Sequence, residues 1–321
     1  MSAPVAASRR PVVGLDVGGT SMKGLLVLLP DGPGTPEVIA LARNATPVSD
    51  GVDAVVAAMH DTISELVDAA TRHGLPAPER AGVVVPGIVD EVEGIARSAV
   101  NLGFRDLPLA ALLEASSGLA ISLGHDVRAG GIAEARLGAA RGGDNVLFVP
   151  LGTGVAASCV VDGSALMAGG YAGELGHVIV RPGGEPCPCG QTGCLERYAS
   201  ASAVARHYVE AGGDPVDGSA DVATRLEAGD PIAREVWDDA VEALVTALLL
   251  ACAVLGPSVV VIGGGLAQAG EALLGPVRSG LHARMTFHRR PTVVAAELGD
   301  QAGALGAALI AAAHAHDGVA P

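Results

Sequence analysis

Residues 12–29 read VVGLDVGGTSMKGLLVLL, in which two apolar runs flank Asp16 and the turn Gly18-Gly19-Thr20. Two apolar runs joined by a short glycine turn predict a β-hairpin. The turn has neither of the standard phosphate-loop spacings, but its exposed backbone N–H groups are suited to holding a phosphate. We therefore expect a hairpin with a phosphate-facing turn, although one such turn is a weak signal of function.

The same layout recurs at residues 145–161, NVLFVPLGTGVAASCVV, around the turn Gly152-Thr153-Gly154. This recurrence predicts two related lobes, each presenting one hairpin of this kind. A third turn, Gly263-Gly264-Gly265, follows the apolar run SVVVI and precedes a helix expected to begin near Leu266. A glycine turn between a strand and a helix is a place where adenine or ribose packs against the backbone. Together the three turns favour nucleotide binding over ordinary loop chemistry.

Asp126 lies between an apolar run that predicts a strand and a helix expected to begin near Val127. A carboxylate at this position has two interpretations. It caps the N-terminus of the helix, or it accepts a proton from a hydroxyl group during phosphoryl transfer. The sequence alone does not decide between them.

A loop at residues 173–196, GELGHVIVRPGGEPCPCGQTGCLE, holds three of the five cysteines of the chain. Clustered cysteines in a reducing compartment are more often metal ligands than disulfides. Cys187, Cys189 and Cys194, together with the nearby His177, offer the ligand set of a tetrahedral zinc site. Four protein ligands leave no open position on the metal, so a structural zinc is favoured over a catalytic one.

The same loop carries a carboxylate at each end, Glu174 and Glu196. A metal that ties the loop together would bring these two side chains close together. Two fixed acceptors beside an imidazole suit the hydroxyl groups of a sugar, although either glutamate alone would be interpreted as a solvated surface charge. We therefore expect the loop to form a wall of a sugar site with the metal as its support. The glycine turns that bind the nucleotide are expected to be distant from it.

Composition excludes two other partner classes. The net charge is −15 and no block of Lys or Arg is present, which argues against a nucleic-acid partner. Residues 243–262 are uncharged over about a membrane-spanning length, but Gly256-Pro257 divides them into a helix-like part and a strand-like part. The N-terminal residues lack the apolar region of a signal peptide. We expect a cytoplasmic protein with no membrane partner.

These motifs resemble those of the ROK family, which comprises sugar kinases, repressors and uncharacterised members. The stretch from Asp16 to Thr20 is similar to the first phosphate motif of the family, Gly152–Gly154 to its second and Gly263–Gly265 to its adenosine motif. GELGH followed by CPCGQTGCLE resembles the zinc and sugar signature of the family, and this pair is highly specific. The resemblance covers nearly the whole chain.

The resemblance implies an α/β, actin-like (ribonuclease-H-like ATPase) fold with two lobes around a cleft. Residues 1–122 would form the small lobe, completed by the C-terminal helix in residues 301–321, and residues 123–300 the large lobe. It also implies transfer of the γ-phosphate of ATP to a hexose, foremost the 6-hydroxyl of glucose. The implied cofactors are ATP, Mg²⁺ and structural Zn²⁺, and the implied assembly is a homo-oligomer, either a dimer or a tetramer.

By position, the resemblance assigns the role of catalytic base to Asp126 and places Asp16 against the magnesium. The implied sugar contacts are Gly87, Asn101, His125, Asp126, Glu174, His177 and Glu196. The implied nucleotide contacts are Asp16, Gly18, Gly19, Thr20, Gly152, Thr153, Gly154, Gly263, Gly264 and Gly265.

Lys23, the single lysine of the chain, stands at the foot of the first hairpin and is a further candidate nucleotide contact. Strand alternation places Lys23 with Leu25 on one face and Met22 with Gly24 on the other. Projection of Lys23 into solvent is therefore the alternative interpretation.

Three features bear on which branch of the family the chain resembles. His125 stands where Asn is common, which leaves the sugar open among glucose, fructose, mannose and N-acetylhexosamines. Val155-Ala156-Ala157-Ser158 stands where glycines are common, and its Cβ atoms would narrow the approach to phosphate. No helix-turn-helix region precedes Val12, which favours a kinase over a repressor. A catalytically weak or inactive sugar-sensing protein is the alternative function, and polyphosphate is an alternative phosphate donor.

Overall fold

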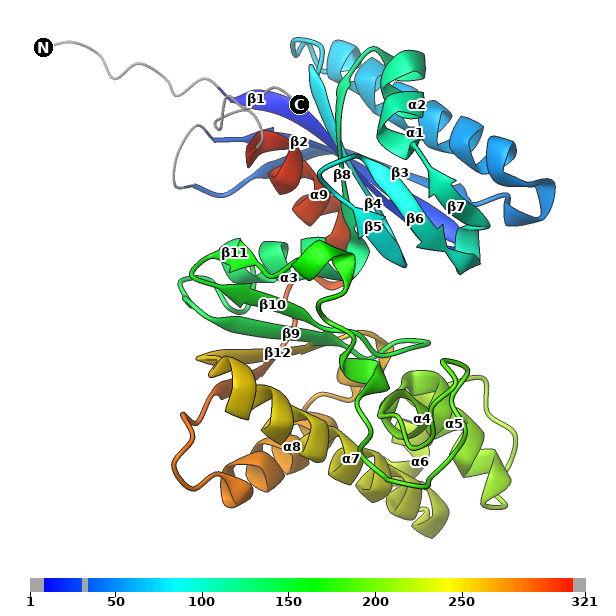
Figure 1. Cartoon of the computed structure of the whole chain (residues 1–321), viewed down its shortest axis with the longest axis vertical. Helices are drawn as coiled ribbons and strands as arrows, with labels where there is room; N and C mark the ends of the chain where they lie inside the picture. Colours follow the sequence, from blue (N-terminus) through cyan, green and yellow to red (C-terminus); the bar gives the residue numbers. More distant parts are fainter. Residues whose placement is uncertain (1–8, 31–33, 314–321) are drawn as a thin grey trace, which may run out of the picture. The chain divides into compact units, whose positions relative to one another are not determined.

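The chain divides into two compact units, which are labelled by element in Figure 1. A computed structural model describes residues 9–30 and 34–313. The first unit takes the described parts of Met1–Ala133, Met167–Tyr171 and Asp300–Pro321, and the second consists of Glu134–Leu166 and Ala172–Gly299. Each unit has a five-stranded sheet with helices packed on it, which confirms the predicted α/β class.

The boundary between the units differs from the one expected at residue 122. The chain leaves the first unit after Ala133, within helix α3 (Asp126–Arg136). The reason is that the start of α3 packs on helix α9 (Ala302–Ala313), so closely that a Cβ at Gly306 would lie 2.0 Å from the carbonyl oxygen of Ala129. Asp126 therefore belongs to the first unit and not to the lobe in which the sequence placed it.

The main sheet of the first unit has the strand order β3-β2-β1-β4-β8. Strands β1 and β2 form the predicted antiparallel hairpin, β3 continues it, and β4 and β8 lie parallel to β1. The strands of this unit are β1 (Arg10–Val17), β2 (Ser21–Leu29), β3 (Glu37–Ala45), β4 (Arg80–Val85) and β8 (Ala120–His125), with a small separate sheet of β5 (Ile88–Asp90), β6 (Ile95–Ala99) and β7 (Phe104–Leu107).

Helices cover both faces of this main sheet (Figure 1). Helices α1 (Val52–Arg72) and α2 (Leu109–Ser117) pack on one face, and their apolar residues form the larger core of the unit. Helix α9 packs on the other face against β1 and β4. The short 3₁₀ helices of this unit are η1 (Val48–Asp50), η2 (Val100–Leu102), η3 (Ala168–Gly170) and η6 (Gly299–Gln301).

The sheet of the second unit has the strand order β11-β10-β9-β12-β13. Strands β9 and β10 are antiparallel, which confirms the second predicted hairpin, and β12 lies parallel to β9. The strands are β9 (Val146–Pro150), β10 (Ser158–Val161), β11 (Ser164–Ala165), β12 (Val259–Gly263) and β13 (Thr292–Ala295). The helices are α4 (Glu196–Ala199), α5 (Ala201–Glu210), α6 (Ser219–Glu227), α7 (Pro231–Leu255) and α8 (Glu271–Arg284), with 3₁₀ helices η4 (Leu175–His177) and η5 (Gly265–Ala269).

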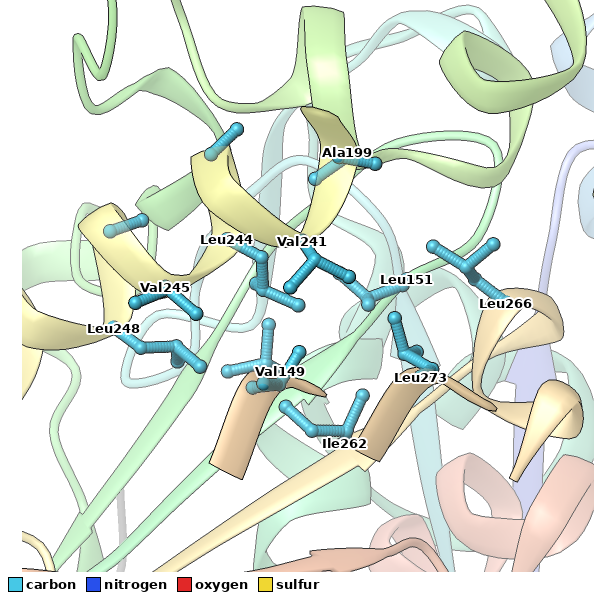
Figure 2. Packing of buried hydrophobic residues seen from close by; sticks show 14 of the residues in the cluster. Val149, Leu151, Ala199, Val241, Leu244, Val245, Leu248, Ile262, Leu266 and Leu273 are labelled. Carbon is cyan, nitrogen blue, oxygen red and sulfur yellow. The ribbon is translucent and has the colours of Figure 1, made fainter. Parts of the chain in front are cut away.

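The uncharged stretch at residues 243–262 is a buried helix followed by a buried strand, as predicted. Helix α7 ends at Gly256, whose left-handed backbone (φ 55°) lets its N–H donate to the carbonyl of Cys252 at 3.0 Å. Figure 2 shows Leu244 and Leu248 of α7 packed over Val149 of β9 and Ile262 of β12. In the described part of the chain, no helix combines the length and the apolar character needed to cross a membrane.

The helix expected to begin near Leu266 is only the 3₁₀ helix η5, and the α-helix α8 begins later, at Glu271. Gly264 has a left-handed φ of 78°, and a Cβ there would lie 2.5 Å from the backbone of Leu151. Gly270 has a φ of 56° and interrupts the helical path once more. The predicted helix is therefore present as the 3₁₀ helix η5, and two glycines in left-handed conformations delay the start of the α-helix to Glu271.

Helix α9 sits against the sheet without room for a side chain between them. A Cβ at Gly82 of β4 would lie 1.9 Å from the carbonyl oxygen of Ala307. We expect Gly82→Ala to lower the free energy of unfolding by about 1–3 kcal/mol, because the added methyl must push two backbones apart. Gly218→Ala is the matched control, since its Cβ would meet nothing within 4 Å. Equal denaturation midpoints for the two variants would contradict this packing.

Candidate functional site

Asp16 lies near the end of β1, directly opposite Lys23 on β2. Its carboxylate faces α9, because a Cβ at Gly303 would lie 2.3 Å from Asp16 Oδ2. Burial, above all, and the negative charge of Asp126 together raise the pKa of Asp16 to about 7, while the positive charge of Lys23 opposes the change. Two carboxylates that repel one another in this way favour a cation near them, and carboxylate oxygens are the ligands that a magnesium ion prefers.

Lys23 lies on the same face of the sheet as its register partner Asp16 and on the opposite face from Met22. Its neighbour Met22 faces α1, where Thr62 Oγ1 lies 3.2 Å from Met22 Sδ. The side chain of Lys23 is 27% exposed, and its Nζ lies 3.6 Å from Asp300 Oδ2. Lys23 therefore does not simply project into solvent but is held by an acidic partner.

The sequence did not identify Asp300, whose carboxylate forms ion pairs with side chains of two neighbouring strands. Arg43 of β3 is the register partner of Lys23, and both side chains form ion pairs with Asp300. The hydrogen bond from Arg43 lowers the pKa of Asp300 below its ordinary value. Asp300 and Arg43 are separated by 257 positions, so no local pattern points to this pair.

Asp126 is the first residue of α3, and His125 stands immediately before the helix. The ring nitrogen Nδ1 of His125 accepts from the backbone N–H groups of Val127 at 3.2 Å and Arg128 at 3.5 Å. Asp126 Oδ1 accepts from Val127 N–H at 2.7 Å, and the side chain of Asp126 is 31% exposed. Both side chains thus accept from N–H groups at the start of α3, and the carboxylate of Asp126 remains partly exposed.

A buried ion pair that the sequence did not predict holds the first turn of α3. Arg128 Nε donates to Glu91 Oε1 at 2.6 Å, and the two side chains are only 3% and 16% exposed. The guanidinium also lies 3.5 Å from the carbonyl oxygen of Gly170. A buried ion pair with additional hydrogen bonds fixes the positions of both side chains, so it orients the turn that carries Asp126.

Two further predicted site residues of the first unit, Gly87 and Asn101, lie where backbone segments approach one another closely. Gly87 has a φ of 95°, and a Cβ there would lie 2.1 Å from the carbonyl oxygen of Ser98, so only glycine fits. Asn101 lies in η2 and its backbone oxygen would lie 3.2 Å from a Cβ at Gly19. Asn101 and the first glycine turn are therefore neighbours, as a shared site requires.

The structure brings the four predicted metal ligands together in the second unit. One ligand atom from each of His177, Cys187, Cys189 and Cys194 lies within 4.8 Å of all the others. Ligands bound to a tetrahedral zinc ion lie about 3.8 Å apart. The distance from Cys189 Sγ to Cys194 Sγ is 3.6 Å, and that from His177 Nδ1 to Cys187 Sγ is 3.8 Å. The residues therefore fit a structural zinc ion.

The buried thiol of this cluster favours the same interpretation. Burial raises the pKa of Cys194 to about 12. A thiol in that position becomes a thiolate readily only when a cation offsets the cost of burying its charge. Zinc would supply that charge.

His177 is turned so that its two ring nitrogens serve different neighbours. Nδ1 faces Cys187, while Nε2 lies 3.8 Å from Glu174 Oε2. A metal on Nδ1 would leave the proton on Nε2, where it donates to an acceptor. Glu174 is 53% exposed and stands beside this donor. The pair therefore presents both a donor and an acceptor to a hydroxylated ligand.

The sequence had predicted a metal loop distant from the glycine turns. Glu196 of this loop lies instead beside the second turn. Its Oε2 accepts from the backbone N–H of Val155 at 2.9 Å, directly after the turn Gly152–Gly154. The expectation that the metal loop and the nucleotide turns are distant was wrong for this turn. The two stretches are separated by 41 positions in the chain, which is why the contact has no local signature.

Three of the four residues after this turn are buried. Val155 and Ala157 are 5% and 3% exposed, and both belong to the hydrophobic core of the second unit. Ser158 is buried as well, at the start of β10. Their side chains therefore fill the core, and of the four only Ala156 is partly exposed.

The second and third glycine turns are neighbours. Leu151 N–H donates to the carbonyl of Gly263 at 2.9 Å, and Leu266 N–H donates to the carbonyl of Leu151 at 3.1 Å. The turn at Gly152–Gly154 and the turn at Gly263–Gly265 thus share one edge of the second sheet. One ligand with a phosphate end and a nucleoside end suits such a pair of turns.

Comparisons with known proteins agree with this geometry. The model of the ROK family matches residues 12–314. A glucokinase of Thermotoga maritima is 33% identical over 93% of this chain and 96% of its own length. The structure of a ROK family glucokinase from Streptomyces griseus in complex with glucose and AMPPNP is 28% identical, with a TM-score of 0.78 over 94% of this chain and 99% of that one. These matches confirm the actin-like ATPase fold.

The family also contains regulators of similar structure. A ROK family transcriptional regulator, a homolog of the E. coli MLC protein, is 25% identical with a TM-score of 0.82. That match covers 94% of this chain and 77% of the regulator. Likeness of fold therefore does not by itself separate a kinase from a transcriptional regulator.

The metal cluster predicts a zinc content that can be measured. We expect about one zinc per chain in the wild-type protein by elemental analysis. Cys189→Ser should lose that zinc and lower the melting temperature, because a serine hydroxyl is a poor zinc ligand and Cys189 is exposed enough to be replaced without repacking. Cys159→Ser, at a buried thiol outside the cluster, is the control and should keep its zinc. Zinc retained in Cys189→Ser would remove Cys189 from the ligand set.

The raised pKa of Asp16 predicts a pH-dependent stability. Its folded pKa of about 7 lies above the ordinary value of 3.8, so the folded chain holds a proton that the unfolded chain releases, and this stabilisation is lost as pH rises toward about 7. In magnesium-free buffer, Asp16→Asn should therefore gain in unfolding free energy relative to wild type between about pH 5 and pH 7, and level off above. Asp61→Asn, at an exposed position of α1, should show no such trend. A constant difference for Asp16→Asn would contradict the raised pKa.

Proposed function

The chain belongs to the ROK family, and on that premise we propose that it transfers the γ-phosphate of ATP to the 6-hydroxyl of glucose. The observation that carries the proposal is the accessible carboxylate of Asp126 beside Asp16, at the junction of β8 and α3. Sugar kinase activity is supported by the glucokinase relatives. Glucose as the acceptor is supported by the Streptomyces griseus structure, which holds glucose and AMPPNP.

In the proposed reaction Asp126 accepts the proton of the attacking hydroxyl group. The sugar oxygen forms a bond to the γ-phosphorus as the bond from that phosphorus to the leaving ADP oxygen breaks. His125 holds the turn on which Asp126 stands through its helix-capping contacts. Arg128 holds the same turn through its ion pair with Glu91.

Asp16 is proposed to hold Mg²⁺, which would neutralise phosphate charge when bound. The other nucleotide contacts are proposed at the first turn (Gly18, Gly19, Thr20), at the second turn (Gly152, Thr153, Gly154), at the adenosine turn (Gly263, Gly264, Gly265) and at Lys23. Lys23 would offer a phosphate the ammonium group that Asp300 holds at 3.6 Å. The ion pair keeps this group on the face of the sheet that carries Asp16.

Sugar contacts are proposed for Glu174, His177 and Glu196 in the second unit and for Gly87, Asn101 and His125 in the first. The donor at His177 Nε2 and the acceptor at Glu174 match adjacent hydroxyl groups of a hexose. The four metal ligands would hold these side chains in place, so zinc would act on sugar affinity through the loop and not on the chemical step.

A sugar-binding regulator without phosphotransfer is the second candidate. The observation that favours it is the match to the transcriptional regulator, which is as close in structure as the match to the glucokinase. The presence of both carboxylates, Asp16 and Asp126, favours the kinase.

An ADP-release assay with Mg²⁺, ATP and a panel of hexoses tests the proposal. We expect kcat/KM to be highest for glucose among glucose, fructose, mannose and N-acetylhexosamines. Asp126→Asn should lower kcat by about 10²–10⁴ with little change in glucose affinity, because the isosteric amide cannot accept the proton. Asp61→Asn, on the exposed face of α1, should turn over like wild type.

Two outcomes would contradict the proposal in different ways. Glucose binding without ADP release from any sugar would favour the regulator. Near wild-type turnover of Asp126→Asn would mean that another group removes the proton, and would reduce Asp126 to its place at the start of α3.

A further inference from the structure

The carboxylate of Glu196 lies against the backbone of the second glycine turn. Its Oε2 accepts the N–H of Val155 at 2.9 Å, and a Cβ at Gly154 would lie only 2.5 Å from the same oxygen. Gly154 has no left-handed backbone that would require glycine. The carboxylate occupies the space that a side chain at this position would need, so a Cβ there would displace it.

Glu196 lies close in sequence to the predicted metal ligands. The ligand Cys194 is fully buried and stands two residues before Glu196. Arg197 N–H donates to the carbonyl of Cys194 at 3.1 Å, which closes the turn that contains Glu196, and Leu195 N–H donates to the carbonyl of Val178 at 2.9 Å. These bonds fix the backbone of Glu196 relative to the metal ligands.

The other arm of the metal loop contacts the same stretch of chain. Ala157 N–H donates to the carbonyl of Gly173 at 2.7 Å. A Cβ at Gly176 would lie 2.1 Å from the carbonyl oxygen of Val155, so the backbones touch there as well. The segment after the glycine turn is therefore held between both arms of the loop that carries His177 and Glu196.

We propose that Glu196 is a positioning residue for the phosphate turn at Gly152–Gly154, in addition to its proposed contact with sugar. The proposal rests on the proposed function of these two sites. With Oε2 on the Val155 N–H, Glu196 still has Oε1 to offer a hydroxyl group, since a carboxylate accepts several hydrogen bonds. A sugar held on Oε1 would fix the carboxylate and through it the turn, so glucose and nucleotide binding would reinforce each other.

Three variants separate this role from a plain sugar contact. Glu196→Asp keeps the charge but is one methylene too short to reach Val155 N–H. Gly154→Ala keeps Glu196 but displaces its carboxylate. Glu196→Gln keeps an acceptor oxygen at the right length and loses only the charge. Glu174→Asp is the matched control at the other end of the loop, where the side chain faces His177.

The primary measurement is the Kd of AMPPNP without sugar, by calorimetry on the zinc-loaded protein. Glu196→Asp and Gly154→Ala should each weaken AMPPNP binding by about tenfold, which is the effect of one lost hydrogen bond to a charged group. Glu196→Gln should weaken it by about threefold or less, because the neutral amide oxygen still accepts the bond. Glu174→Asp should weaken glucose binding and leave the Kd of AMPPNP unchanged.

Hydrogen exchange at the Val155 amide tests the contact without any ligand. Exchange there should be faster in Glu196→Asp and Gly154→Ala than in wild type, and unchanged in Glu174→Asp. Faster exchange in a protein that binds neither AMPPNP nor glucose would support the positioning contact while the proposed function failed. Unchanged exchange and unchanged AMPPNP affinity in Glu196→Asp would overturn the proposal and leave Glu196 as a sugar contact only.

Discussion

The acidic centre of the first unit depends on a backbone contact between α9 and the sheet. A Cβ at Gly14 would lie 2.0 Å from the carbonyl oxygen of Ala304, and the packing at Gly82 is equally close. Because neither strand carries a side chain at these points, the helix can approach until its own glycine, Gly303, lies against the carboxylate of Asp16. Asp300, just before the helix, then reaches Lys23. Glycines on two strands thus decide where the charges of the site lie.

This arrangement explains why the site concentrates negative charge. Asp16, Asp126 and Asp300 stand together, and each of the other two raises the pKa of Asp16 after the larger effect of burial. A nucleotide is itself an anion, so these carboxylates can share a site with phosphate only if cations lie between them. Lys23 supplies one fixed positive charge at this place. In the proposed function, a bound Mg²⁺ would supply further positive charge.

In the second unit, the side chains proposed to contact sugar stand on a loop with little regular structure. Between Gly173 and Leu195 the chain has only the short η4 and isolated bridges. Four residues that fit a metal ion lie at the centre of this loop, and a bound metal would replace the hydrogen-bond ladder that fixes a strand. The bond from Val155 to Glu196 would then extend that support to the neighbouring glycine turn. One small cluster would thus hold in place side chains that regular secondary structure does not hold.

Local sequence patterns determined the hairpins, the helix and strand at residues 243–262, and the metal ligands. Each of these depends on residues close together in the chain, so spacing and apolar periodicity are enough to reveal it. Tertiary structure alone decided the boundary after Ala133, the burial that raises the pKa of Asp16, and the contact of Glu196 with Val155. These features arise where segments distant in sequence pack without room for a side chain or with a buried charge between them, and such contacts leave no periodic trace in either segment.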